Sequence, residues 1–311
     1  MTKFLGPEVL GRHGYRYSLS EKNGIVYTCK AGHIDISHVR IAADWTAYLT
    51  AKSFDCLMRN KAGFSFKLKV DRTKHFVRIS YPQDWKGLAQ EDKEEIAREV
   101  SIKLGQYLAY TATTWHEILT WFGFKCMGLY PEFPSAFSWE DSFSNLLGSH
   151  IAVQALRDPE HEFNEAMTLL IDEELAKLGV QERHVAIQAS KSVRGEWFSG
   201  NMFVKMKKRN FDIGLDDGYV TPSLVGSVCE CEGAKAQVYA APKLDFLGEY
   251  GFSVQVRIEP REWEKSKILK IVYPNTKNRR KRLNPAIHFA KIMDFLKKEA
   301  VIKYDYDIGL N

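Results

Sequence analysis

The sequence GIVYTCKAGHIDISHVRIAADWTAYLTAKSFDCLM, residues 24–58, runs from a predicted strand directly into a predicted helix. Residues 24–29 are rich in apolar and β-branched side chains, as in a short strand. From residue 37 to residue 58 apolar side chains recur every three or four positions, which predicts a helix with one buried face, and Asp35 or Ser37 is a suitable N-cap. The apolar set of this face is Ile41, Trp45, Tyr48, Leu49 and Cys56.

Further along the chain the patterns alternate between helix and strand. Residues 64–81 predict a β-hairpin, residues 90–122 a long helix that Gly123 ends, and residues 138–153, 160–178 and 182–190 three more helices. Strands are predicted at 236–240 and 252–258, and Pro285 opens a last helix. The predicted fold class is therefore α+β: a helical N-terminal half with a small sheet, and a strand-rich C-terminal half closed by a helix.

Length and composition predict a folded protein of one or two domains. The 311 residues are 45% hydrophobic and 27% charged, and the net charge of +5 is too small to imply a nucleic-acid partner. No run approaches the ~18 consecutive apolar residues of a membrane helix, so no transmembrane segment is expected, and the start lacks the apolar core of a signal peptide. A boundary is expected near Gly195, between a helical subdomain, 1–194, and a strand-rich one, 195–311, unless both form one compact domain.

The five cysteines are few, odd in number and scattered, unlike those of a small disulfide scaffold. Most are therefore expected to be buried thiols. Cys229 and Cys231 are one residue apart, which differs from the C-x-x-C spacing of redox and zinc sites, and this spacing predicts alternating positions of a strand. The other three are Cys29, Cys56 and Cys126.

The predicted turn from strand to helix, residues 32–40, contains two imidazoles, a carboxylate and a guanidinium. Asp35 and His38 are three residues apart, so at a helix start they can face the same way and bind one metal ion or hold one water. Taken alone, the pair is better explained by an N-cap aspartate and a hydrogen-bonded histidine.

A second polar group lies inside the long helix. Thr113, His116 and Thr120 share one face, and Glu117 adjoins His116. Polar atoms on an otherwise apolar helix need partners. The segment is not the H-E-x-x-H zinc motif, because position 120 is threonine. Any metal bound by His116 must take its other ligands from elsewhere in the chain.

A third polar group opens the next helix. Glu140 and Ser144, and likewise Asp141 and Asn145, are four residues apart and can interact. Ser138 followed three residues later by an acid resembles a capping box. Because the helix dipole stabilises acids in a first turn, capping without chemistry explains either acid equally well when it is taken singly.

Together the three groups predict the site of a metal-dependent hydrolase, in which carboxylate and imidazole ligands hold a divalent ion and a carboxylate base activates water. Zinc is the first candidate for the ion. The predicted metal ligands are Asp35, His38 and His116, the catalytic residues Glu117 and Glu140, and the substrate-binding residues Arg40, Asp141 and Asn145. The competing hypothesis is a buried network that fixes helix packing, with Arg40 pairing Asp44 or Glu140.

Other motifs carry less information. The chain contains no G-x-S-x-G nucleophile elbow, no G-x-G-x-x-G and no P-loop. Residues 278–282, Asn-Arg-Arg-Lys-Arg, form a basic run that can touch phosphate or an anionic membrane surface. A solvated loop is the competing explanation, because aromatic neighbours for base stacking are sparse.

Several motifs spread over most of the chain point to one family. They are Leu-Gly-x-His at 10–13 followed by 24–44, WHExxTWFG at 115–123, and SAFSxEDxxSNxxG at 135–148, with looser matches at 209–214, at 222–225 and in the closing helix. They resemble a bacterial family catalogued as domain of unknown function 4056. The resemblance implies an exported envelope protein or lipoprotein of the periplasm or outer envelope, and no particular reaction. His33 departs from the family pattern, in which an aromatic residue is expected.

Two function hypotheses follow. The first is a metal-dependent hydrolase that acts on a lipid, glycan or peptide of the cell envelope. The second is a non-catalytic envelope binding or structural protein, whose strand-rich half presents the binding surface and whose basic run at 278–282 serves attachment. The sequence predicts no oligomeric state.

Overall fold

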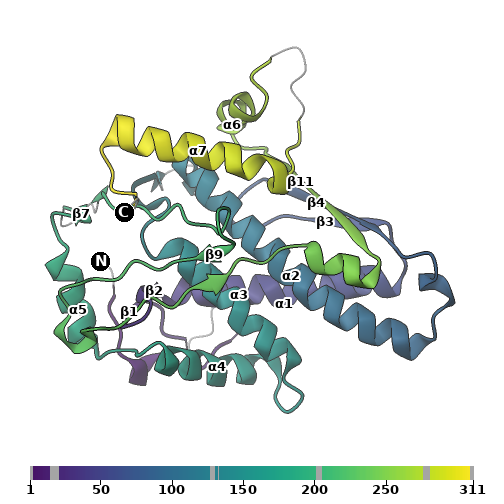
Figure 1. The fold of residues 1–311 in the computed structure, drawn as a ribbon, viewed down its shortest axis with the longest axis horizontal. Coiled ribbons are helices and arrows are strands. Elements are labelled where there is room, and N and C mark those ends of the chain that lie inside the picture. Colours follow the sequence, from purple (N-terminus) through teal and green to yellow (C-terminus); the bar gives the residue numbers. More distant parts are fainter. Residues whose placement is uncertain are drawn as a thin grey trace. The chain divides into compact units, whose positions relative to one another are not determined.

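The computed structural model describes residues 3–14, 21–126, 130–131, 133–200, 205–275 and 281–308 (Figure 1). The fold is mixed α+β, as the sequence predicts: helices dominate the N-terminal half, the strands form small antiparallel sheets, and a helix closes the C-terminal half. None of the helices in these residues is both long and apolar enough to cross a membrane. Short 3-10 helices are η1 (Pro7–Val9), η2 (Trp85–Gly87), η3 (Phe133–Ser135), η4 (Cys229–Cys231) and η5 (Asp245–Tyr250).

The chain forms two compact units, each assembled from separate stretches of sequence. The first unit consists of Met1–Ala47, Phe137–Ala241 and Asp305–Asn311, and the second of Tyr48–Ala136 and Pro242–Tyr304. Helix α1 (Ile36–Met58) contributes residues to both. Gly195, where the composition suggests a boundary, lies inside the first unit. The units are therefore discontinuous in sequence, in contrast to the continuous subdomains expected from composition.

A hairpin opens the first unit. Strand β1 (Ile25–Thr28) pairs antiparallel with β2 (Gly32–Asp35), and β2 passes directly into α1. Gly32 has a φ of +65°, and a Cβ atom there would overlap the backbone carbonyl of Ser223. Residues other than glycine rarely adopt this φ, and their Cβ atom would have no space at this turn. The hairpin thereby fixes where α1 begins.

Three helices follow in the first unit: α3 (Asp141–Arg157), α4 (Phe163–Lys177) and α5 (Arg183–Ser192). The sequence predicts all three, with slightly different ends. Helix α3 packs against α4 and β2, and α5 packs against β1. Apolar side chains of β1, α5 and the loops after it surround Trp139 and Trp197, whose rings lie 5.4 Å apart. This cluster is the core beneath the hairpin.

Gly148 allows α3 to approach the start of α1 closely. A Cβ atom at this position would overlap the backbone carbonyl of Val39. Backbone cannot move aside as a flexible side chain can, so only glycine fits here. The approach brings the first turn of α3 to the junction of β2 and α1, where the Asp35 amide donates a hydrogen bond to Ser144 Oγ at 3.0 Å.

The stretch from 195 to 241 contains very short strands. Strand β7 (Phe198–Ser199) pairs with β8 (Lys205–Met206), and β9 (Tyr219–Val220) pairs with β10 (Tyr239–Ala240). Of the strand predicted at 236–240, only the last two residues are strand. The pairing partner of β10 is a two-residue strand, so the ladder cannot extend further.

The expectation that most cysteines are buried thiols is wrong, because only Cys56 fits it among the four whose side chains the structure describes. Cys29 and Cys231, 202 residues apart in sequence, form a disulfide with Cα atoms 4.9 Å apart. The segment from Cys229 to Cys231 is the 3-10 helix η4, not a strand. Cys56 is a buried free thiol, Cys229 is an exposed one, and the Cys126 side chain lies outside the described part. The disulfide requires η4 to lie against the β1–β2 turn, and cysteine spacing does not encode such a long-range contact.

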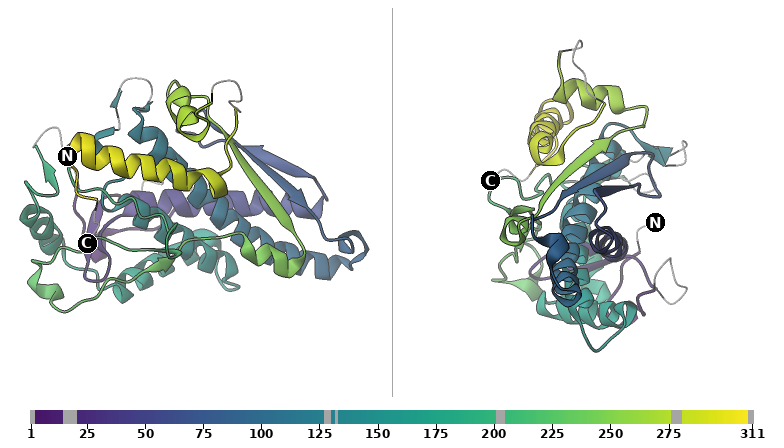
Figure 2. Two further views of the ribbon diagram at one scale, coloured as in Figure 1. Left: turned by 45° about the horizontal axis from the view of Figure 1, so that its top comes forward. Right: turned by 90° about the vertical axis from the view of Figure 1, so that its right-hand side faces the viewer.

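The second unit is built on a three-stranded antiparallel sheet of order β11–β4–β3 (Figure 2). Strands β3 (Gly63–Phe66) and β4 (Lys74–Ser80) form the predicted hairpin. The strand predicted at 252–258 is confirmed as β11 (Ser253–Glu259), which pairs with β4 from Ser253↔Ser80 to Glu259↔Lys74. A small hairpin, β5 (Lys125–Cys126) with β6 (Tyr130–Pro131), follows the long helix of this unit.

The helices of the second unit are α2 (Gln90–Trp121), α6 (Lys265–Val272) and α7 (Pro285–Tyr304). Helix α2 ends as predicted, with Gly123 at a φ of +99°. The rings of Trp115 on α2 and Phe289 on α7 stack with centroids 6.3 Å apart, so these two helices share a core. Helix α6 packs against α7.

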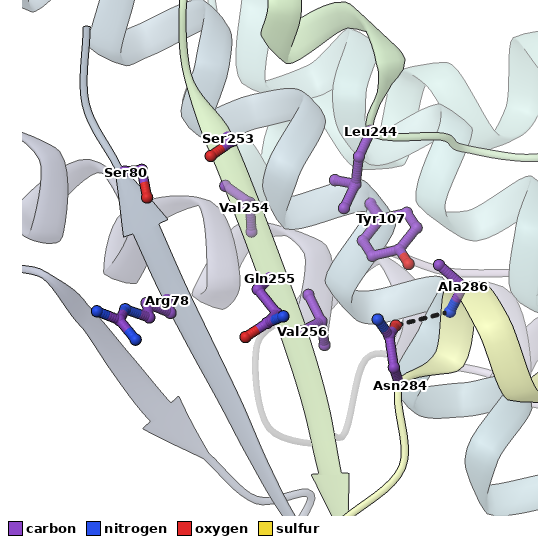
Figure 3. Close-up of a pocket in the computed structure, with 10 residues that line it drawn as sticks. All are labelled: Arg78, Ser80, Tyr107, Leu244, Ser253, Val254, Gln255, Val256, Asn284 and Ala286. Atoms are coloured by element: carbon purple, nitrogen blue, oxygen red, sulfur yellow. Dashed lines mark hydrogen bonds between the residues drawn. The ribbon is translucent and has the colours of Figure 1, made fainter. Parts of the chain in front are cut away.

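A pocket of about 440 Å³ lies along strand β11 of the second unit. Figure 3 shows Arg78 and Gln255 beside each other on strands β4 and β11, and Tyr107 and Asn284 on the opposite side of β11. The Asn284 carboxamide accepts a hydrogen bond from the Ala286 amide at 3.1 Å, so it caps α7. The described residues that line this pocket include no carboxylate or imidazole. The titratable side chains among these lining residues are those of Arg78 and Tyr107.

Candidate acid–base site

Asp35 and His38 form the centre of the candidate site in the first unit. Strand β2 ends at Asp35 and the first turn of α1 carries His38, whose Nδ1 lies 3.3 Å from Oδ2 of Asp35. The other oxygen of Asp35 accepts a hydrogen bond from the Ser37 amide at 2.7 Å, so this aspartate also caps α1. The imidazole is 33% exposed. It is accessible to a molecule in solution.

Asp141 brings a second carboxylate to the same imidazole. Its Oδ1 lies 3.6 Å from Nδ1 of His38, and its Oδ2 accepts a hydrogen bond from the Ser138 amide at 2.9 Å. The predicted capping box is wrong, because the N-cap of α3 is Glu140 and Ser138 lies two residues before it. Because Nδ1 faces two carboxylates, we infer that the neutral ring carries its proton there and keeps Nε2 as an acceptor.

Glu140 is a buried acid next to Asp141, 9% exposed. Burial raises the pKa of Glu140, and the negative charge of Asp35 raises it further, to about 7, against hydrogen bonds from the backbone and Ser138. Its Oε2 atom is buried and has no hydrogen-bond partner among the described residues. A carboxyl group that is half protonated near pH 7 can hold a proton that an ordinary glutamate has lost.

Asp35 has the opposite electrostatic character. Burial raises the pKa of Asp35, but hydrogen bonding and charge from His38, with hydrogen bonds from Ser37, outweigh burial and lower the pKa overall. The carboxyl groups of Asp35 and Glu140 therefore have pKa values displaced in opposite directions. Enzymes use such pairs with one carboxyl protonated and the other ionised.

Asn145 and Arg40, both predicted to bind substrate, are buried. Asn145 is 3% exposed, and within the described ranges its Oδ1 atom has no hydrogen-bond partner. Arg40 is also 3% exposed, and its guanidinium donates to the carbonyls of Leu10 at 2.8 Å and Gly11 at 3.2 Å. These bonds hold the N-terminal segment against α1. A contact of Asn145 or Arg40 with substrate stays a prediction.

His33 occupies an aromatic environment. Its ring meets the rings of Tyr27 at 5.0 Å and Trp139 at 6.0 Å, both edge to face. Burial lowers the pKa of His33 to about 4. At neutral pH the ring is therefore uncharged and packs as the aromatic residue of the family pattern would.

His116 and Glu117 lie on α2 in the second unit. His116 Nδ1 is 3.5 Å from Oδ2 of Asp71, and its ring packs edge-on against Phe124 with centroids 5.4 Å apart. Burial raises the pKa of Asp71, although His116 opposes the rise. The predicted convergence of His116 and Glu117 with Asp35 and His38 stays a prediction.

A polar network surrounds Asp71 in the second unit. Thr73 Oγ1 donates to Oε2 of Glu262 at 2.8 Å and accepts from the Trp115 indole at 2.9 Å, while the Thr73 amide donates to Asp71 at 3.1 Å. The Arg72 amide donates to the other oxygen of Glu262 at 2.8 Å. These hydrogen bonds tie the loops that carry Thr73 and Glu262 to the Trp115 indole of α2. Asp71 and Glu262 lie in loops without periodicity, so the sequence pattern carries no signal for either of them.

A second buried histidine of the first unit was also missed. His13 has a fully buried side chain, with Nδ1 3.5 Å from Glu21 Oε1 and Nε2 3.3 Å from Asp44 Oδ1. The Leu-Gly-x-His motif at 10–13 is the one sequence signal for it. The three side chains come from the N-terminal segment and from α1, so their proximity is a tertiary property.

The zinc site predicted from Asp35, His38 and His116 also stays a prediction. Within the part of the chain that the structure describes, no group of three or more His, Cys, Asp or Glu side chains is placed to hold a metal ion. The basic run at 278–282 lies outside the described residues except for Lys281 and Arg282. Arg282 pairs with Glu259 at 2.8 Å.

The family comparison agrees with the resemblance seen in the motifs. Residues 10–218 match a family model described as protein of unknown function (DUF4056). This is more than half of the chain, and it includes Asp35, His38, Glu140 and Asp141. No curated protein and no solved structure matches the chain.

Proposed function

The chain belongs to the DUF4056 family, and we propose that Asp35, His38 and Glu140 form the acid–base site of a hydrolase that acts on a cell-envelope component. The observation that carries the proposal is the partly exposed imidazole of His38, whose Nδ1 faces the carboxylates of Asp35 and Asp141. An imidazole whose Nδ1 is held by carboxylates presents Nε2 as a base.

In the proposed mechanism His38 acts as the general base. Nε2 removes a proton from a water molecule as that water attacks the substrate, and the carboxylates of Asp35 and Asp141 stabilise the imidazolium that forms. Glu140, with its pKa raised to about 7, supplies a proton when the leaving group departs. The distances of 3.3 and 3.6 Å from Nδ1 to the two aspartates are compatible with such a site, because catalytic hydrogen bonds shorten when substrate binds.

The metal-dependent form of the proposal adds a divalent ion, with zinc as first candidate. Asp35 and His38 carry the oxygen and nitrogen donors that zinc prefers. This form also requires His116 as a ligand and Glu117 as a base from the second unit, with Arg40, Asp141 and Asn145 binding the substrate. The general-base form requires residues of one unit alone, so it is the form to test first.

The disulfide supports a place of action in the periplasm or outer envelope. Disulfides form and persist in oxidising compartments and are rare in reducing ones. Cys29 and Cys231 are bonded across 202 residues, which binds the first hairpin to a late loop of the same unit. A lipid, glycan or peptide of the envelope is therefore the substrate class that we propose.

The test is hydrolysis of purified peptidoglycan, anionic phospholipid vesicles and nitrophenyl esters by wild type and a His38→Ala variant. Loss of a general base lowers turnover by about 10²–10⁴-fold. The matched control is His161→Ala, since His161 also pairs with an aspartate three residues earlier, Asp158, and its side chain is 32% exposed against 33% for His38. We expect the control variant to keep full activity.

Melting temperature and metal content separate the remaining hypotheses. The hydrolase predicts an unchanged melting temperature for His38→Ala, whereas a structural network predicts a clear fall. Full activity in His38→Ala, or no hydrolysis of any of these substrates by wild type, would contradict the proposal. Plasma mass spectrometry on protein purified without chelator tests the metal: a stoichiometric ion lost in both His38→Ala and His116→Ala supports the metal-dependent form.

A further inference from the structure

A second pocket, of about 820 Å³, lies in the second unit, and its lining includes no residue of the proposed hydrolase site. Its walls come from the end of α2, from α6 and from α7, and Figure 2 shows α6 and α7 side by side. Only Trp121 and Phe122 of its lining lie within residues 10–218, the part that matches the family model. The pocket therefore belongs mostly to the C-terminal part of this chain.

Apolar and basic side chains alternate on both helices that line the pocket. Helix α6 presents lysines at 267 and 270 and Ile271, and α7 presents Lys291, Asp294, Phe295 and Lys298. Spacings of three and four residues place each set on one helical face. The two faces meet at the pocket, so apolar and cationic groups are mixed along its walls.

The apolar wall is formed by rings. Phe122 and Phe295 stack with centroids 6.1 Å apart and an interplanar angle of 19°, and Trp121 meets Tyr304 edge to face at 5.8 Å. Phe295 remains 39% exposed. An exposed aromatic ring beside a pocket is a surface that a ligand's apolar part can cover.

Three of the five lysines that line the pocket have partners within the unit. Lys267 donates to the carbonyl of Phe122 at 3.4 Å, and Lys291 to that of Val272 at 3.3 Å, so both neutralise helix C-termini. Lys303 pairs with Glu299 at 3.1 Å, and the second oxygen of Glu299 accepts from the Trp121 indole at 2.9 Å. A structural role accounts for these three lysines.

Lys270 and Lys298 are different. Both are exposed and line the pocket from facing helices, and in the described ranges neither makes a hydrogen bond or an ion pair. The lining contains five lysines against two carboxylates, one of which, Glu299, is already paired. The pocket therefore has a positive potential beside an apolar wall.

We propose that this pocket binds an anionic amphiphile with a phosphate head group. The apolar chain lies against Phe122, Ile271 and Phe295, and the phosphate lies between Lys270 and Lys298. Lysine ammonium groups bind phosphate as point charges, and covering the exposed ring of Phe295 with an apolar chain removes apolar surface from water. A free phosphate would use the two lysines but not the rings, so the ring contribution separates a lipid from a phosphate ion.

The experiment is isothermal titration calorimetry of the full chain with myristoyl-lysophosphatidylglycerol below its critical micelle concentration. Replacing both pocket lysines, Lys270→Glu with Lys298→Glu, is expected to weaken binding at least about tenfold, as the loss of a charge-assisted contact does. Phe295→Ala is expected to weaken binding as well. The matched control, Lys265→Glu with Lys297→Glu, changes the same charge on the same two helices at positions outside the lining, and we expect binding within about twofold of wild type.

Glycerol phosphate and a neutral monoacylglycerol complete the design. Binding of glycerol phosphate as tight as that of the lysolipid would overturn the amphiphile and leave a plain phosphate site. Equal binding of the monoacylglycerol, equal loss in the control variant, or no binding by wild type would each overturn the proposal. Circular dichroism checks that each variant folds. The double variant Lys270→Gln with Lys298→Gln removes both charges but keeps polar side chains, and it should also weaken binding.

Discussion

Glu140 and Asp35 are both residues of the candidate acid–base site, yet their surroundings shift their pKa values in opposite directions. Asp35 is partly exposed, accepts the Ser37 amide and faces His38, so its ionised form is stabilised. Glu140 is buried, and its Oε2 finds no partner among the described residues, so its neutral form is favoured. The difference in burial and hydrogen bonding, not residue type, decides which carboxyl group can give a proton.

A prediction at this scale concerns stability against pH. The folded-state pKa of Glu140, about 7, lies above its ordinary value of 4.5, so between these pH values the folded protein holds a proton that the unfolded chain has lost. The free energy of unfolding therefore falls as pH rises through this window and stays lower above it. Glu140→Gln removes this contribution of Glu140 to the pH dependence. As pH rises across the window, the variant therefore gains stability relative to wild type, by on the order of a few kcal/mol.

The measurement is the urea midpoint of both proteins at several pH values across this window. Glu165→Gln, at an exposed acid in the first turn of α4, is the control, and its midpoint should track that of wild type. Parallel pH curves for Glu140→Gln and wild type would show that Glu140 ionises as an ordinary carboxyl group.

At the scale of elements, the site depends on how closely α3 approaches α1. His38 is on α1 and Asp141 on α3, and the two meet because Gly148 lets α3 lie against the backbone of Val39. The Asp35 amide then reaches Ser144 Oγ, which ties the end of β2 to the first turn of α3. The geometry of the imidazole and its two carboxylates is thus a property of one helix crossing.

Gly148→Ala is expected to separate these two helices. The new Cβ atom overlaps the Val39 carbonyl, and overpacking of this kind costs about 1–3 kcal/mol of stability, more than the helix propensity of alanine returns. A lower melting temperature and lower hydrolytic activity should appear together. Gly226→Ala is the control, since a Cβ atom there meets nothing within 4 Å. An unchanged melting temperature in Gly148→Ala would mean that the crossing adapts without cost.

At the scale of the whole molecule, the chain leaves its first unit after α1 begins and returns to it at Phe137. The Cys29–Cys231 disulfide then joins two stretches of that unit that are 202 residues apart. A covalent link over such a long loop restricts the unfolded chain strongly. It stabilises a unit whose parts are distant in sequence.

Removing this link should destabilise the protein by roughly 2–4 kcal/mol. We expect Cys231→Ser to melt at a lower temperature than wild type, and wild type to fall to the same temperature when a reducing agent is added. Cys229→Ser, which removes an exposed free thiol two residues away, is the matched control and should melt as wild type does. A melting temperature that responds to neither the Cys231 change nor reduction would contradict the structural role of the disulfide.

Local pattern was sufficient for most elements and for part of the site. Periodicity predicted α1, α2 and α7, and the alternation at 64–81 predicted the β3–β4 hairpin. The spacing of three residues between Asp35 and His38 predicted their contact, which the structure confirms at 3.3 Å. The predicted buried face of α1 is right for Leu49 and Cys56, which are buried, and wrong for Tyr48, which is 41% exposed. Ala42 and Ala43, which the prediction omitted, are fully buried.

The sequence by itself determined the α+β class, the principal helices and the Asp35–His38 pair, because these depend on backbone hydrogen bonds and side-chain contacts within a few residues. Tertiary structure alone decided the contact of Asp141 with His38, the raised pKa of Glu140, the Cys29–Cys231 bond and the addition of β11 to β4. Each of these joins residues far apart in the chain. Their proximity is selected by the packing of the whole unit, in which burial and the exclusion of water act on all segments at once, and no local spacing records that outcome.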